Sequence, residues 1–195
     1  MAFEIAPVPG ATPLGPDEMH GLRPTHIITQ ADLDAAEAAN ILDAVTWATR
    51  NRPKDILQGA FVLELHRRMF GDVWRWAGTW RRRQTNIGVE PATVVTRVEG
   101  LLSDVRYWVK HRTYERAQIA VRLHHQMVFI HPFPNGNGRH TRLMADLLSE
   151  ELGLESFSWG GANLSAQSGA RERYIDALHA ADGGDLDPLL AFARS

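Results

Sequence analysis

The sequence has 195 residues, of which 44% are hydrophobic, and its formal net charge at pH 7 is -2. These values are typical of one ordinary globular domain with a substantial core. The chain contains no cysteine, which excludes disulfide bonds, thiolate metal sites and cysteine nucleophiles. No apolar run approaches the length of a membrane span, and the first residues lack the pattern of a signal peptide. We therefore expect a cytoplasmic protein.

The first segment differs in composition from the rest of the chain. Residues 1–28 are rich in proline and show no sustained periodicity, so we expect an N-terminal arm that is extended or lies as a strap across the surface. Helical spacing of apolar residues dominates afterwards. We expect residues 29–195 to form a single, mainly α-helical domain, since no internal boundary is visible.

The first expected helix spans residues 29–50. Thr29 is a typical N-cap residue, and the apolar stripe of the helix includes Leu33 and Ala44. Glu37 lies on the same stripe. A carboxylate on a buried face requires a partner, whereas a half-exposed one requires none, and the sequence leaves both interpretations open.

A second helix is expected over 56–70, followed by tryptophans at 74, 76 and 80, for which packing is a simpler role than an exposed platform for bases. Residues 80–95 are the best β candidate in the chain. An arginine triplet at 81–83 opens this segment. The triplet could make a functional contact, or it could form a solvated edge that discourages aggregation. The sequence leaves both interpretations open.

Two further helices are expected over 93–111 and 114–130. A third should follow residues 131–142 and end at Gly153. A fourth should run from Asn163 or Ser165 to about 182, and a short one should span 187–192. His124 and His125 lie in the second of these. Together with His131 and His140 they invite a metal site, but their spacing matches no common zinc pattern. We expect His124 and His125 to be packed or hydrogen-bonded instead.

Residues 131–142 carry the strongest chemical signal. The stretch begins with His131, whose side chain has a solution pKa near neutrality. The turn at 136–138, Gly-Asn-Gly, permits positive φ and close approach of a ligand, and its consecutive N–H groups converge on an anion. The helix that follows adds its positive dipole end, and Arg139 and Arg142 fit phosphate oxygens. The stretch predicts a phosphate site beside a general base.

The same stretch resembles the signature of Fic-domain proteins, a His-x-Phe-x-acid-Gly-Asn-Gly-Arg-x-x-Arg pattern. The matching residues are His131, Phe133, Gly136, Asn137, Gly138, Arg139 and Arg142. The resemblance extends from about Asp32 to the C-terminus, in particular to the bacterial subgroup called mobile mystery protein B. It implies a Fic-type helical bundle, with His131 as the catalytic base and Phe133 as the loop anchor. It also implies that ATP phosphates are bound by Gly136, Asn137, Gly138, Arg139 and Arg142.

The resemblance implies a protein adenylyltransferase, which moves AMP from ATP to a Ser, Thr or Tyr hydroxyl of a target protein with Mg²⁺ as cofactor. The target would be bound at a hairpin flap over about 80–95 by strand pairing. One position departs from the pattern, because Asn135 stands where the family has the acid that holds magnesium. An asparagine oxygen can bind magnesium but brings no charge, so we expect a weak metal ligand.

Many Fic proteins also carry a glutamate, on an added helix, that pairs with the second signature arginine and blocks productive ATP binding. Only the glutamate of that motif matches here, as Glu37. The resemblance thus implies an inhibitory helix over 29–50 and a pair between Glu37 and Arg142.

Three alternatives stay open. The chain could transfer another phosphate-containing group, such as a phosphoryl group or another nucleotide. It could be a catalytically weak binding module of a toxin–antitoxin-like pair, with the helix-turn-helix partner protein that the subgroup implies. The third alternative is nucleic-acid binding through the arginines. The net charge of -2 argues against it. We expect no membrane partner.

Overall fold

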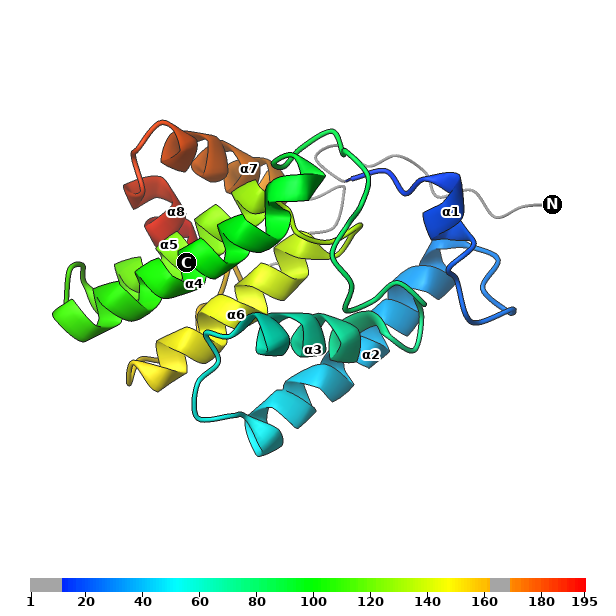
Figure 1. Ribbon diagram of the computed structural model, residues 1–195, viewed down its shortest axis with the longest axis horizontal. Coiled ribbons are helices and arrows are strands. Elements are labelled where there is room, and N and C mark those ends of the chain that lie inside the picture. The colour runs from blue at the N-terminus through cyan, green and yellow to red at the C-terminus, as the bar shows by residue number, and fades with distance from the viewer. Residues whose placement is uncertain (1–11, 162–168) are drawn as a thin grey trace.

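Figure 1 shows the computed structural model, which describes residues 12–161 and 169–195. The mainly α-helical fold is confirmed. In chain order the helices are α1 (Pro16–Met19), α2 (Gln30–Asn51), α3 (Gly59–Phe70), the short 3-10 helix η1 (Pro91–Thr93), α4 (Val94–His111), α5 (Arg116–Ile130), α6 (Asn137–Glu151), α7 (Gly169–Asp182) and α8 (Asp187–Ala193).

The helices α5 and α6 pack along each other at the centre of the molecule. Figure 1 shows α4 beside α5, α2 and α3 on one side of this pair, and α7 and α8 on the other. Fully buried apolar side chains fill the space between them, among them Leu65, Leu102, Leu123, Met127 and Met144. The residues that join α5 to α6 therefore lie between two helices of the core.

The sequence predicted the start of α2 correctly. Thr29 is its N-cap: the Thr29 hydroxyl accepts a hydrogen bond from the Asp32 backbone N–H at 3.1 Å, and the Asp32 carboxylate accepts one from the Thr29 N–H at 3.0 Å. Such a capping box satisfies two N–H groups that have no partner inside the helix.

Two other helices begin later than expected. The start of α3 is Gly59 rather than residue 56, because the Asp55 carboxylate accepts a hydrogen bond from the Leu57 N–H at 2.9 Å and holds a turn there. The start of α5 is Arg116 rather than residue 114. The expected helix start at Asn163 or Ser165 lies outside the described residues.

The expected β-hairpin over 80–95 is wrong. Within residues 12–161 and 169–195 the structure contains no strand. It contains only an isolated bridge between Leu22 and Trp74. Residues 80–90 form an irregular loop that leads into η1. This loop pairs with the end of α5 rather than with itself, since the Arg81 N–H donates to the Pro132 carbonyl at 2.9 Å.

The Arg81 side chain explains why a hairpin does not form. It is 2% exposed, and its guanidinium donates to the carbonyl oxygens of His131 at 2.6 Å, Arg83 at 3.0 Å and Ile130 at 3.3 Å, and also to that of Val89. One buried side chain thus satisfies two carbonyls of this segment and two at the end of α5.

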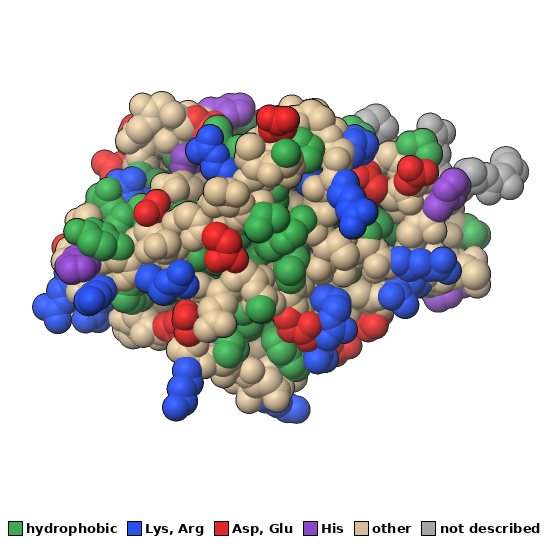
Figure 2. Space-filling view, viewed as in Figure 1, with side chains coloured by type: hydrophobic (Ala, Val, Ile, Leu, Met, Phe, Trp, Pro, Cys, Tyr) green, Lys and Arg blue, Asp and Glu red, His purple; other side chains and the backbone are tan. Residues whose placement is uncertain are grey.

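Acidic and basic side chains are mixed on the face of the molecule that Figure 2 shows, and no continuous basic stripe crosses this face. In the parts of the chain that the structure describes, no helix is long and apolar enough to cross a membrane.

Candidate active site

His131 lies at the C-terminal end of α5, in an unusual backbone conformation. It is the C-cap of that helix, with φ +55° and ψ +62°. A side chain other than glycine rarely adopts this left-handed region. The conformation is held from two sides, because the His131 N–H donates to Met127 at 3.0 Å and the His131 carbonyl accepts from Arg81 at 2.6 Å.

The contacts of the His131 ring define its tautomer. Nδ1 lies 3.4 Å from the Val128 carbonyl oxygen, which can only accept, so we assign the proton to Nδ1. Nε2 therefore presents its lone pair, and it lies 2.6 Å from the hydroxyl oxygen of Thr12. Burial lowers the pKa of His131 to about 4, which keeps the ring neutral at pH 7. A neutral imidazole that accepts from a hydroxyl is the starting state of a general base.

The loop after His131 is held in the core by Phe133 and Asn137. Phe133 is fully buried, with its ring stacked on His66 at 3.7 Å and on Trp80 at 5.3 Å between centroids. The Asn137 amide accepts from the Phe133 N–H at 2.9 Å and donates to the Phe133 carbonyl at 2.8 Å. Because the Asn137 side chain braces the loop in this way, we expect its contribution to phosphate binding to come from the backbone N–H.

Glycine is required at the first position of the turn, where any other residue would clash. Gly136 is the N-cap of α6 with φ +77°, and a Cβ there would lie 2.6 Å from the ring of Phe70. At Gly138 a Cβ would lie 3.5 Å from the guanidinium of Arg142, which is an ordinary contact. The first N–H groups of α6 have no partner inside the helix, so this end offers donors and a positive dipole to an anion.

Arg139 does not have the environment that the sequence suggested. Its guanidinium lies 2.6 Å from a carboxylate oxygen of Glu37, and the other oxygen of Glu37 accepts from the indole N–H of Trp74 at 2.6 Å. The expected pair between Glu37 and Arg142 is therefore wrong. Trp74 orients the buried carboxylate toward the first signature arginine, while Arg142 lies over the ring of Tyr174 at 5.5 Å.

Arg171 is a further cation at this site that sequence reasoning missed. It lies on α7, and burial lowers its pKa, with further lowering by the nearby guanidinium groups of Arg142 and Arg139. Like charges exert this effect only when they are close. The charge of Arg171 on α7 thus acts on the two signature arginines at the start of α6. The sequence offers no signal for this, because α7 follows a long intervening segment.

His66 is a second residue that sequence reasoning missed. The Gly78 N–H donates to its Nδ1 at 3.0 Å, so Nε2 carries the proton and donates to the Asn135 carbonyl at 3.1 Å. His66 is fully buried under the loop, and it fixes the backbone where the loop turns. The only signal that could have revealed it is its place on the inner stripe of the helix expected over 56–70.

The residues near the loop do not form a magnesium site. The Asn135 side-chain oxygen accepts from the Gly136 N–H at 2.6 Å, and its amide nitrogen donates to the Thr12 carbonyl at 3.0 Å. Within the described residues there is no group of three His, Asp or Glu side chains that could hold a metal ion. As expected, His124 and His125 are hydrogen-bonded, to Tyr174 at 3.0 Å and to Asp182 at 2.8 Å.

Comparison with known proteins agrees with this geometry. Residues 57–149 match the Fic/DOC family. Protein adenylyltransferase Fic of Culex quinquefasciatus is 30% identical over 153 residues, which cover 74% of this chain and 28% of that protein. Protein adenylyltransferase fic-1 of Caenorhabditis elegans is 32% identical over 142 residues, with 67% and 25% covered. The chain thus spans about a quarter of the length of these curated relatives.

Two solved structures share the fold. Fic-1 from C. elegans has a TM-score of 0.63 and 26% identity, and the match covers 81% of this chain and 47% of that chain. BepC from Bartonella tribocorum, solved with bound AMPPNP, has a TM-score of 0.68 and 15% identity, with 92% and 97% covered. The narrower resemblance to the mobile mystery protein B subgroup stays a prediction. The buried histidine, the glycine turn and the arginines of residues 131–142 thus lie in a domain that belongs to the Fic/DOC family.

Proposed function

We propose that this protein transfers AMP from ATP to a Ser, Thr or Tyr hydroxyl of a protein. The observation that carries the proposal is the neutral, buried His131, whose Nε2 lone pair accepts from a hydroxyl at 2.6 Å. This base lies one short loop away from a helix start surrounded by arginines. The names of the curated relatives, protein adenylyltransferases, support AMP as the group transferred.

In the proposed reaction, the phosphates of ATP lie at the start of α6, between its first N–H groups and the guanidinium groups of Arg139, Arg142 and Arg171. The acceptor hydroxyl gives its proton to Nε2 of His131 as its oxygen attacks the α-phosphorus, and pyrophosphate leaves. The catalytic effect comes mainly from positioning and charge stabilisation. No step is assigned to Mg²⁺, because the residues here do not form a site for it.

A target protein would approach beside the loop 80–90, whose backbone lies along the end of α5. Arg139 is paired with Glu37, so productive phosphate binding requires this pair to open. We therefore propose that the chain rests in an inhibited state. The cytoplasmic location and the helix-turn-helix partner stay predictions.

The test is the intact mass of the purified protein after incubation with ATP and magnesium. Wild type, Glu37→Gln, and Glu37→Gln combined with His131→Ala are compared. We expect an added AMP in the Glu37→Gln protein that is absent when His131 is replaced. An added phosphate would support the alternative of phosphoryl transfer. No adduct on any variant, or on proteins of a lysate mixed with them, would leave the binding-module alternative.

A further inference from the structure

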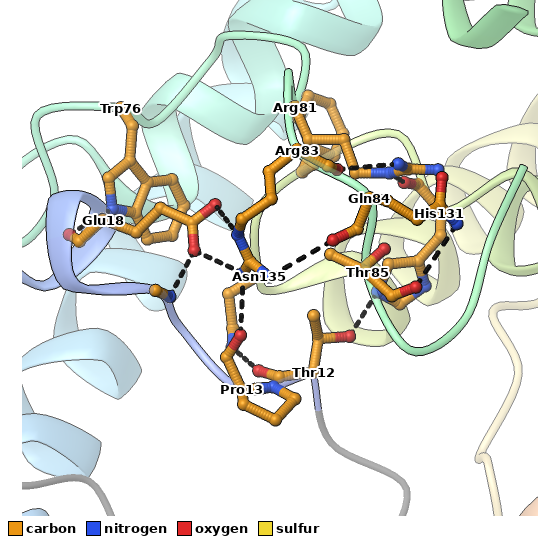
Figure 3. Close-up of polar contacts among 12 residues, drawn as sticks. Thr12, Pro13, Glu18, Trp76, Arg81, Arg83, Gln84, Thr85, His131 and Asn135 are labelled. Carbon is orange, nitrogen blue, oxygen red and sulfur yellow. Dashed lines mark hydrogen bonds and ion pairs between the residues drawn. The ribbon is translucent and has the colours of Figure 1, made fainter. Parts of the chain in front are cut away.

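The described part of the N-terminal arm brings a hydroxyl to the catalytic histidine. Thr12 is 6% exposed, and its hydroxyl oxygen lies 2.6 Å from Nε2 of His131, although the two residues are 119 positions apart in the chain. Figure 3 shows Thr12 and His131 facing each other beneath the loop that carries Arg81. Since Nε2 of this tautomer can only accept, the hydroxyl of Thr12 donates to it.

Contacts on both sides of Thr12 hold the arm in place. The Asn135 amide donates to the Thr12 carbonyl at 3.0 Å, and Arg83 donates to the Pro13 carbonyl at 2.9 Å. Arg83 also pairs with Glu18 at 2.7 Å, and the Glu18 carboxylate accepts from the Gly15 N–H at 2.6 Å. These interactions are visible together in Figure 3. The arm is thus held by Asn135 of the active-site loop and by Arg83 of the loop 80–90.

We propose that Thr12 is an intramolecular acceptor, so that the protein adenylylates its own N-terminal arm. This inference rests on the proposed function. A bond forms between the Thr12 hydroxyl oxygen and the α-phosphorus of ATP, and the bond from that phosphorus to the β-phosphate oxygen breaks. The hydroxyl proton passes to Nε2 of His131, pyrophosphate leaves, and Thr12 carries AMP as a phosphodiester.

The geometry favours an acceptor over a simple plug. An N–H group would satisfy the buried Nε2 equally well, whereas Thr12 places a hydroxyl proton on the lone pair that would remove it. The Thr12 carbonyl contacts Asn135, the residue that precedes the anion-binding turn. Reaction within one chain also benefits from a high effective concentration. Once modified, Thr12 has no proton to donate to Nε2, so the contact that seats the arm is lost.

The experiment localises AMP on the chain after incubation with ATP and magnesium, by mass spectrometry of fragments. The Glu37→Gln protein is compared with the same protein carrying Thr12→Val, Thr12→Ser or Thr25→Val. Thr25 is an exposed threonine of the same segment and serves as the matched control. We expect AMP on residue 12, retained in Thr12→Ser and Thr25→Val. In Thr12→Val, labelling of the arm should fall at least about tenfold, the factor that 1.4 kcal/mol represents.

A mixing experiment tests whether the reaction is intramolecular. The Glu37→Gln, Thr12→Val protein is mixed with a His131→Ala chain that retains Thr12. We expect the His131→Ala chain to acquire AMP at least about tenfold more slowly than a chain with both residues modifies itself, because the two groups then meet only by collision.

The outcomes separate this inference from the proposed function. His131-dependent AMP on other residues only, at an equal or higher rate in Thr12→Val, would overturn Thr12 as acceptor and leave the adenylyltransferase standing. Equal labelling between separate chains would overturn the intramolecular step. No AMP on any protein in any variant would overturn both proposals.

Discussion

The chemistry of His131 depends on a single proton. Its pKa is lowered to about 4, mainly by burial, so the neutral form persists well below pH 7. We expect the single-turnover rate of AMP transfer to be unchanged between pH 6 and 8 as far as this group is concerned, and to fall only as the pH approaches about 4. A rate that halves near the ordinary histidine value of about 6.5 would contradict the buried state described here.

Glu37 is paired with Arg139, and we propose that this pair limits the availability of Arg139. A Glu37→Gln change keeps an oxygen for the Trp74 indole N–H but removes the charge that holds the guanidinium. We expect ATP to bind about tenfold tighter, equivalent to 1.4 kcal/mol, as measured by calorimetry. Glu64→Gln is the matched control, because Glu64 pairs with Arg67 and Arg68 on the outer face of α3. An unchanged affinity of the Glu37→Gln protein for ATP would contradict the inhibitory role.

Arg171 should act on phosphate rather than on the base of the nucleotide. Replacing it with Gln removes a positive charge that acts on Arg139 and Arg142. We expect ATP affinity to fall about tenfold, with adenosine binding unaffected. Arg173→Gln, an exposed position of the same helix, should alter neither. Equal losses for ATP and adenosine would instead indicate that α7 had been displaced.

Among the elements, the loop 80–90 depends on Arg81. An Arg81→Met change removes the side-chain donor of the His131, Arg83 and Val89 carbonyls, and we expect a loss of about 2–4 kcal/mol in the free energy of unfolding. Arg82→Met is the matched control, since Arg82 is exposed, and its effect should stay within about 0.5 kcal/mol. Denaturant titration measures both, and similar values for the two variants would refute the role of Arg81.

The same loop shows where prediction of an element failed. Residues 80–95 were the best β candidate and the family resemblance implied a hairpin there, but the buried Arg81 side chain is the donor for the Arg83 and Val89 carbonyls of this segment. Propensity is a weak guide wherever a tertiary contact supplies the hydrogen bonds. By contrast, the start of α2 depends on Thr29 and Asp32, which lie within one turn, and there the sequence was sufficient.

For the whole molecule, buried neutral histidines predict sensitivity to acid. Burial lowers the pKa of His66, His124, His131 and His140. The unfolded chain binds protons at these groups below about pH 6.5 while the folded chain does not, so the free energy of unfolding falls as pH drops from about 6.5 toward 4. Urea titrations at several pH values measure this decline.

Asp146 acts in the opposite direction. Burial raises its pKa to about 6, so the folded chain binds this proton more readily than the unfolded one, and protonation below about pH 6 stabilises the fold. An Asp146→Asn variant should therefore lose stability more steeply with acid than wild type does. A stability that is constant from pH 7 to pH 4.5 in both proteins would contradict the buried state of the histidines.

The sequence by itself determined the helical class, the α2 cap and the chemical content of residues 131–142, because helix periodicity, capping and a turn followed by a helix are all local. Only the tertiary structure decided that Glu37 meets Arg139, that Arg171 joins the signature arginines and that Thr12 donates to His131. These partners are far apart in the chain, so no local pattern encodes their meeting. They come together because packing of the helices and of the arm fixes which buried charges and hydrogen-bonding groups can satisfy one another.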